Sequence, residues 1–316
     1  PCGILIFSQS ARLGRTCPCP GIERATNGLL NRSAWSPKGT GTGNVTVQEN
    51  AMPRVSAVSL RDRKKAGEKI AVLTAYDFPT AKLIDQSGVD VILVGDSCGM
   101  VVMGRENTLG VTMDEMVYHT RIAAAAVEHA LVVGDMPFLS YQISPEEAVR
   151  NAGRFITEAG AQAVKLEGPA QRFGKTIRAI LDASIPVMGH IGLQPQSIHQ
   201  LGGYKVQGRD AEGRARLIEE AKGLEAIGCF AIVLECVPAS LAKEITEMVS
   251  IPTIGIGAGP HCDGQVLVMH DMLGMGKYTK FSKVYFDVGA AMKSAFEKYV
   301  AEVKSGAFPA AEQSFE

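Results

Sequence analysis

Polar side chains, most of them acidic or basic, that could bind a metal ion, bind a substrate or move a proton recur at similar places along the sequence. Each of them ends or follows a short apolar run rich in Val, Ile and Leu. The residues are Asp77, Asp96, Ser97, Asp135, Lys165, Glu167, His190 and Glu235. Several carboxylates that converge on an apolar interior would be unfavourable without a cation. Since no pair of histidines or cysteines competes nearby in the sequence, the set predicts an oxygen-ligated Mg²⁺ or Mn²⁺ site rather than a zinc site.

Each of these residues also has an ordinary structural interpretation. A single Asp at a strand end is most often a helix cap or a loop anchor. Lys165 and Glu167 are two residues apart, so both side chains point the same way and could form a structural ion pair. Glu235 could be bonded to backbone, and His190 could be a loop anchor or a ligand contact. The functional interpretation is favoured only because the acids occur together at equivalent places.

The elements that would position these residues alternate regularly from about residue 56 onwards. Apolar runs predict strands, and capping patterns such as Thr112 with Glu115, or Ser144 before Pro145, predict helix starts. The predicted strands are 70–77, 89–97, 130–138, 161–168, 186–192, 230–237, 252–259 and 265–271. The predicted helices are 78–87, 112–129, 144–159, 170–183, 208–227, 239–249 and an amphipathic one at 288–305. Nearly continuous apolar strands are typical of a parallel sheet that is buried on both faces.

Eight strands alternating with helices predict an α/β fold, a (β/α)₈ TIM barrel. Active sites of such barrels lie at the C-terminal ends of the strands, where the polar residues above occur. The step between the seventh and eighth strands is only about five residues, which is too short for a crossover helix. Either a single helical turn replaces the helix there or the eighth strand is wrongly placed. The alternative architecture is an open doubly wound sheet.

Composition and charge exclude several classes of protein. The chain has 316 residues and a formal net charge of -1, so no overall basic field indicates nucleic-acid binding. No apolar stretch reaches the ~18 residues of a membrane span. The 7 cysteines are odd in number and include no C-x-x-C pair, which favours a reducing compartment over a disulfide framework.

Residues 1–53 differ from the rest because they are rich in Gly, Ser, Thr, Asn, Arg and Pro and lack periodicity. They could be upstream sequence translated from a misplaced start, an organelle transit peptide, or a disordered arm. The first interpretation is favoured because the helical pattern begins just after Met52. We therefore expect residues 54–316 to form one catalytic barrel domain with a C-terminal helix.

Seven motifs, in order and in register, resemble the ketopantoate hydroxymethyltransferase family. They are LTAYD at 73–77, VGDS at 94–97, VKLEG at 164–168, GHIGL at 189–193, GGYKVQGR at 202–209, LECVP at 234–238 and IGIGAG at 254–259. The resemblance covers roughly residues 56–316 and extends, more distantly, to the phosphoenolpyruvate mutase and isocitrate lyase barrels.

The resemblance implies transfer of a one-carbon unit from 5,10-methylenetetrahydrofolate to 3-methyl-2-oxobutanoate, giving 2-dehydropantoate for pantothenate and coenzyme A biosynthesis. It also implies a cytoplasmic homo-oligomer, typically a decamer of two pentameric rings, with no nucleic-acid or membrane partner. The resemblance implies that Mg²⁺ is bound by Asp96, Asp135 and Glu167. It implies that the substrate is bound by Asp96, Ser97, Asp135 and Lys165. Glu235 is implied to be the general base, and His190 is an additional candidate.

Two rival functions compete with this interpretation. A magnesium-dependent carbon–carbon lyase or mutase of the related barrels would act without folate, but no lyase motif such as K-K-C-G-H occurs. A catalytically silent binding barrel would lack the acids at the strand ends, and here all of them are present. Departures from the family pattern at Cys98, Gln194 and 103–108 affect the side pocket and folate contacts rather than a catalytic group.

Overall fold

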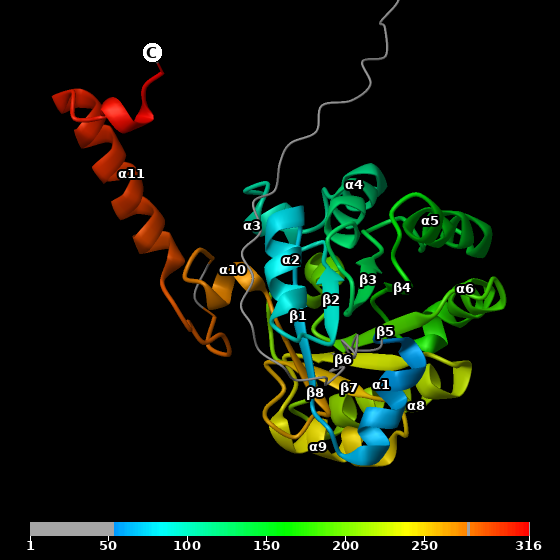
Figure 1. The fold of residues 1–316 in the computed structure, drawn as a ribbon. Coiled ribbons are helices and arrows are strands. Elements are labelled where there is room, and N and C mark those ends of the chain that lie inside the picture. Colours follow the sequence, from blue (N-terminus) through cyan, green and yellow to red (C-terminus); the bar gives the residue numbers. More distant parts are fainter. Residues whose placement is uncertain (1–53, 277–278, 316) are drawn as a thin grey trace, which may run out of the picture. The chain divides into compact units, whose positions relative to one another are not determined.

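Eight parallel strands close into one barrel in the computed structural model, which describes residues 54–276 and 279–315. Each strand pairs with the next, and the last pairs with the first (Figure 1). The strands are β1 (Ile70–Thr74), β2 (Val91–Val94), β3 (Leu131–Asp135), β4 (Ala163–Lys165), β5 (Val187–Gly192), β6 (Ala231–Glu235), β7 (Thr253–Ile256) and β8 (Gly264–Leu267). This order confirms the predicted (β/α)₈ barrel and excludes the open sheet. The interpretation of residues 1–53 lies outside the described residues.

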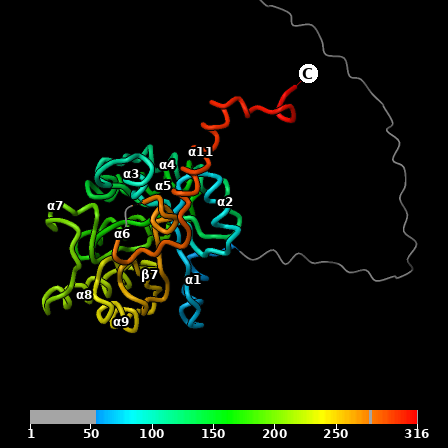
Figure 2. The backbone as a smooth tube through the Cα atoms, turned by 90° about the vertical axis from the view of Figure 1, so that its left-hand side faces the viewer, coloured from blue at the N-terminus to red at the C-terminus, as the bar shows by residue number. Residues whose placement is uncertain are grey.

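Helices surround the strands, as both views of the backbone show (Figures 1 and 2). Between the strands lie α2 (Phe78–Gln86), α3 (Cys98–Val101), α4 (Met113–Ala124), α5 (Pro145–Thr157), α6 (Ala170–Asp182), α7 (Ile198–Leu201), α8 (Ala211–Ile227) and α9 (Ala239–Met248). Before and after the barrel lie α1 (Ala57–Ala66), α10 (Met269–Met272) and α11 (Val288–Ser305). Two 3-10 turns complete the described part of the chain: η1 (Pro195–Ser197) follows β5, and η2 (Ala311–Gln313) follows α11.

Side-chain caps fix where several helices begin. Thr112 and Glu115 form the predicted capping box of α4, in which each side chain accepts a hydrogen bond from the other's backbone N–H. Asp77 accepts a hydrogen bond from the backbone N–H of Thr80 at the start of α2. Asp77 is therefore a helix cap, the ordinary interpretation of a strand-end Asp. Helix α4 ends at Ala124, earlier than the predicted 129.

Alternation along the strands separates the inside of the barrel from its outside. Val91 and Leu93 belong to the apolar cluster inside the barrel, whereas Ile92, between them, packs in the outer cluster beneath the helices. Asp135 continues the inner series Leu131 and Val133 along β3. Polar residues at the ends of strands therefore point into the mouth of the barrel, above an apolar interior.

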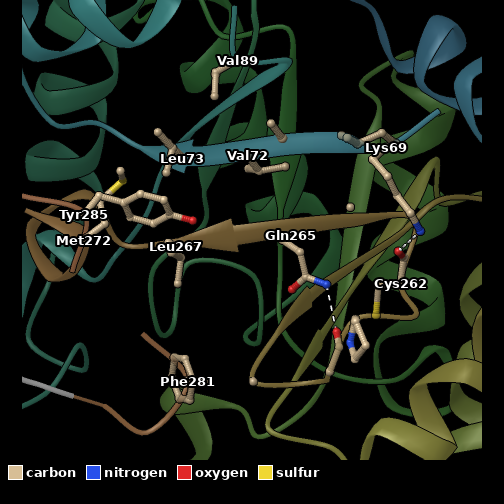
Figure 3. Close-up of a pocket in the computed structure, with 16 residues that line it drawn as sticks. Lys69, Val72, Leu73, Val89, Cys262, Gln265, Leu267, Met272, Phe281 and Tyr285 are labelled. Atoms are coloured by element: carbon tan, nitrogen blue, oxygen red, sulfur yellow. Dashed lines mark hydrogen bonds between the residues drawn. The ribbon is translucent and has the colours of Figure 1, made fainter. Parts of the chain in front are cut away.

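The connection from β7 to β8 departs from the regular pattern. Residues 257–263, all of them described, contain no helix, so the short step is confirmed and the helical-turn alternative is wrong. The outer face here is open: Gln265 of β8 is exposed, whereas Val266 beside it is buried in the barrel. A groove of about 810 Å³ lies along this outer face of β1 and β8, with Tyr285 at its edge (Figure 3).

Helix α11 confirms the amphipathic helix predicted at 288–305, with the same bounds. None of its residues is buried against the described part of the chain. No helix among the described residues is long and apolar enough to cross a membrane.

Packing of β3 against α5 leaves no room for a side chain at Gly134. A Cβ there would clash with the ring of Phe155, whereas a Cβ at Gly153 of α5 would meet no described atom within 4 Å. We expect Gly134→Ala to lower the free energy of unfolding by about 1–3 kcal/mol through overpacking. The matched Gly153→Ala should raise it by up to ~1 kcal/mol, because Ala favours a helix. Urea unfolding followed by circular dichroism measures both changes; an unchanged Gly134→Ala protein would contradict this packing.

Candidate active site

The predicted residues meet at the C-terminal end of the barrel. Asp135, Lys165 and Glu235 are the last residues of β3, β4 and β6, and His190 lies within β5. A cavity of about 330 Å³, within the usual size range of ligand sites, is lined by Asp96, Ser97, Asp135, Lys165, Glu167, His190 and Glu235. The larger groove outside β1 and β8 lacks these residues. The smaller cavity is therefore the candidate active site.

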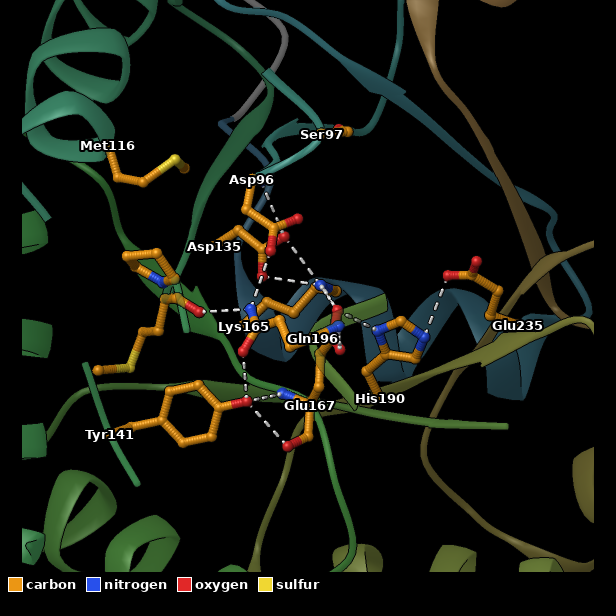
Figure 4. Close-up of polar contacts among 12 residues, drawn as sticks. Asp96, Ser97, Met116, Asp135, Tyr141, Lys165, Glu167, His190, Gln196 and Glu235 are labelled. Carbon is orange, nitrogen blue, oxygen red and sulfur yellow. Dashed lines mark hydrogen bonds and ion pairs between the residues drawn. The ribbon is translucent and has the colours of Figure 1, made fainter. Parts of the chain in front are cut away.

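A buried ion pair forms the centre of the site (Figure 4). Lys165 Nζ lies 2.7 and 2.9 Å from the two carboxylate oxygens of Asp135, and 3.8 Å from Oε1 of Glu167. The backbone N–H of Asp96 donates to Oδ2 of Asp135 at 3.2 Å. None of these four residues is more than 4% exposed. Three carboxylates thus share one ammonium group in a space that is nearly closed to water.

Burial and crowding shift the protonation of this cluster. Burial, and then the neighbouring Asp135 carboxylate, raise the pKa of Asp96 to about 7. Burial also raises the pKa of Glu167 well above its ordinary value, although the charge of Lys165 opposes the shift. Burial by itself would lower the pKa of Lys165, but the surrounding carboxylates outweigh it and raise that pKa. Lys165 therefore stays charged, whereas Asp96 and Glu167 hold their protons more strongly than exposed acids do.

His190 lies between two carboxylates from neighbouring strands. Its Nδ1 is 3.6 Å from Oε1 of Glu167, and its Nε2 is 3.2 Å from Oε2 of Glu235 (Figure 4). Among the described residues, neither ring nitrogen has a partner aligned for a hydrogen bond. Burial, and then the charge of Lys165, lower the pKa of His190, so the imidazole is neutral near pH 7. His190 therefore belongs to the site, between the buried cluster and the more accessible Glu235.

Three further buried polar side chains, to which the sequence assigned no role, form hydrogen bonds within the site: Tyr76, Tyr141 and Gln196. The Tyr76 hydroxyl is 2.9 Å from Oγ of Ser97. The Tyr141 hydroxyl lies 2.8 Å from Oε1 of Gln196, whose Nε2 donates to Asp96. The only signal in the sequence was position, since Tyr76 lies inside the 73–77 motif and Gln196 just beyond the 189–193 motif.

The donor set could hold a hard divalent cation. The described residues include no preformed group of three His, Cys, Asp or Glu side chains around a common point. Asp96, Asp135 and Glu167 nevertheless offer carboxyl oxygens, which Mg²⁺ prefers, and a bound cation would favour the ionised form of these buried acids. The chemistry of the side chains therefore fits Mg²⁺, and Asp135 would have to share its oxygens between Lys165 and the ion.

Removal of the buried ammonium should destabilise the protein. Lys165→Met leaves Asp135 and Glu167 buried without their ion pair, so the free energy of unfolding should fall by about 3–5 kcal/mol at pH 7. Lys222→Met is the matched control, because Lys222 pairs with Glu219 on the exposed surface and should contribute less than about 1 kcal/mol. Guanidinium unfolding compares the two, and equal small losses would show that the buried pair does not stabilise the fold.

Comparison with known proteins covers most of the chain. Residues 54–311 match the family model described as ketopantoate hydroxymethyltransferase. A protein named 3-methyl-2-oxobutanoate hydroxymethyltransferase from Syntrophomonas wolfei is 57% identical over 266 residues, which are 84% of this chain and 96% of the relative. A protein of the same name from Geobacter metallireducens is 57% identical over 260 residues, which are 82% of this chain and 97% of the relative.

Solved structures share the fold at low identity. Phosphonopyruvate hydrolase in complex with oxalate and Mg²⁺ has a TM-score of 0.56 and 13% identity, over 82% of this chain and 93% of that one. The 2,3-dimethylmalate lyase, a phosphoenolpyruvate mutase/isocitrate lyase superfamily member, has a TM-score of 0.53 and 17% identity, over 82% and 92%. These structures confirm the predicted type of barrel. The match over residues 54–311 and the relatives at 57% identity show that the chain belongs to the ketopantoate hydroxymethyltransferase family.

Proposed function

We propose that the protein transfers a hydroxymethyl group from 5,10-methylenetetrahydrofolate to 3-methyl-2-oxobutanoate, giving 2-dehydropantoate. Family membership and the name of the relatives support the substrate. The observation that carries the proposal is the placement of a carboxylate, Glu235, in the same cavity as the buried acidic cluster, with His190 between them. A base and a cation site within one cavity suit the removal of a weakly acidic C–H proton next to a ketone.

The proposal assigns the metal to the buried cluster. Asp96, Asp135 and Glu167 would hold Mg²⁺, and their burial with one ammonium supports that assignment. The ion would supply Lewis acidity to the 2-oxo and carboxylate oxygens of the substrate. Ser97, whose Oγ lies 2.9 Å from the Tyr76 hydroxyl, would donate a hydrogen bond to the substrate carboxylate.

The chain's own residues would then move the proton and the charge. Glu235 accepts the C3 proton as the C3–H bond breaks, and the electron pair forms the enolate. The Lys165 ammonium, which stays charged, offsets the negative charge that develops on the enolate oxygen. Water cleaves the two C–N bonds of the methylene group and supplies the oxygen of the one-carbon unit, and its two protons go to the folate nitrogens as tetrahydrofolate leaves. The enolate carbon then bonds to the released one-carbon unit as its C=O bond opens, and the new alkoxide takes the proton held by Glu235.

Further parts of the proposal rest on family membership. They are the folate co-substrate, residues 54–316 as a single catalytic domain, a homodecameric assembly, a cytoplasmic location, and the absence of nucleic-acid and membrane partners.

A magnesium-dependent carbon–carbon lyase or mutase is the second candidate. The observation that favours it is the shared barrel of the phosphonopyruvate hydrolase and dimethylmalate lyase structures. The identity to those proteins is 13% and 17%, whereas the identity to the named transferases reaches 57%, so the transferase is preferred. The two functions differ in their need for folate.

The transferase reaction should require both the metal and the folate. Protein treated with EDTA should form no 2-dehydropantoate from 3-methyl-2-oxobutanoate and 5,10-methylenetetrahydrofolate, and added Mg²⁺ should restore turnover. Mass spectrometry of the quenched reaction detects the product. Cleavage of 2-oxo acids without folate would favour the lyase instead, and full turnover in EDTA would contradict the metal assignment.

Glu235 should be needed for turnover and not for metal binding. Glu235→Gln keeps the size of the side chain but cannot accept the C3 proton, so kcat should fall by about 10²- to 10⁴-fold. Mg²⁺ binding, measured by calorimetry, should be unchanged. The matched control is Glu247→Gln, since Glu247 is exposed on α9 and should leave kcat unaltered. An unchanged kcat in Glu235→Gln would remove Glu235 as the general base.

A further inference from the structure

Gln196 is a buried side chain that joins several parts of the site. It lies in η1, the turn that follows β5, and is 4% exposed. Its Nε2 donates to Oδ2 of Asp96 and to the carbonyl oxygen of Met136, each at 2.9 Å. Its Oε1 accepts from the Tyr141 hydroxyl at 2.8 Å and from Nε2 of Gln142 at 3.3 Å. Both the amide nitrogen and the amide oxygen of Gln196 therefore have two hydrogen-bond partners.

The surroundings of Gln196 allow one orientation of its amide. The Met136 carbonyl can only accept a hydrogen bond, and a carboxylate at Asp96 does the same. A flipped amide would place Oε1 against these two acceptors and Nε2 against the amide donor of Gln142. The network thus fixes the donor end of the amide toward Asp96.

The backbone of Gln196 reaches a second carboxylate. Its N–H donates to Oε2 of Glu167 at 3.0 Å. The Tyr141 hydroxyl lies 3.0 Å from the Glu167 carbonyl oxygen and also accepts from the Glu167 backbone N–H at 3.2 Å. With one proton, Tyr141 donates to either Gln196 or Glu167 at a time. Gln196 and Tyr141 therefore link Asp96, two residues beyond β2, to Glu167, two residues beyond β4 (Figure 4).

A neutral amide suits this place for an electrostatic reason. A cation beside Asp96 would use up the negative charge that a metal ion needs, whereas an amide donor fixes the carboxylate without neutralising it. The Nε2 donor occupies one lone pair of Oδ2, so the remaining lone pairs of that oxygen can still face a cation. Hydrogen bonds to a ligating carboxylate commonly orient it and change metal affinity by about 10- to 100-fold.

We propose that Gln196 is a positioning residue for the divalent cation: its side-chain amide orients Asp96 while its backbone N–H orients Glu167. This inference rests on the proposed function, because it assumes that these carboxylates hold the metal. Gln196 does not touch the reacting carbon in this arrangement and acts through the two acids. Because its two contacts come from different parts of the residue, a side-chain substitution removes the bond to Asp96 and leaves the bond to Glu167.

The test is the affinity of the full-length protein for Mn²⁺, read from the electron paramagnetic resonance signal of free Mn²⁺ in the absence of substrate. Gln196→Met keeps the length of the side chain and removes its hydrogen bonds. We expect its Kd for Mn²⁺ to rise by about 10- to 100-fold. Gln171→Met is the matched control, because Gln171 on α6 donates to a backbone carbonyl on the exposed surface, and its Kd should be that of the wild type.

The results distinguish failure of the Gln196 inference from failure of the proposed metal site. A folded Gln196→Met protein, shown by its circular dichroism and melting temperature, with the wild-type Kd would overturn the inference and leave Gln196 as a structural cross-link. Wild-type protein that binds no Mn²⁺ would overturn the proposed metal site itself, and the inference with it. If Gln196→Met does not fold, Gln196→Leu serves instead, because it also removes the donor to Asp96 and leaves the backbone N–H that bonds Glu167. An unchanged Kd in that folded variant overturns the inference.

Discussion

The buried contact between Lys165 and Asp135 sets the charge balance on which the rest of the site depends. An ammonium and a carboxylate 2.7 Å apart can be buried because each compensates the other's loss of water. Asp96 and Glu167 add two further carboxylates, whose pKa values burial raises. The buried cluster therefore contains three acidic side chains and only one ammonium group. A divalent cation is the partner that such acidic groups favour.

The register of the barrel produces this contact. Asp135 and Lys165 are direct register partners on β3 and β4, so their side chains leave the same face at the same height. His190 on β5 pairs with Val233, and Glu235 is two residues further along β6 on the same face. The base and the buried cluster therefore come close because parallel strands end together. The open step between β7 and β8 lies outside this arrangement and does not alter it.

Sequence patterning predicted the eight strands and the residues at their ends, because buried parallel strands are apolar runs and strand-end polar residues interrupt them. It could not decide that Asp77 is a helix cap, since spacing alone is the same for a cap and a ligand. It also missed the hydrogen bonds between Tyr141 and Gln196, which follow β3 and β5 and meet only after the barrel closes. Such contacts depend on loop geometry, for which a single sequence has no periodic signal.

The central claim is that the buried cluster and the facing carboxylate activate the C3–H bond of a 2-oxo acid. Exchange of the C3 proton of 3-methyl-2-oxobutanoate in D₂O, followed by proton NMR without folate, tests it most directly. We predict exchange with Mg²⁺ and none in EDTA, because loss of the proton precedes the one-carbon transfer. Equal exchange under both conditions, or no exchange under either, would contradict the claim.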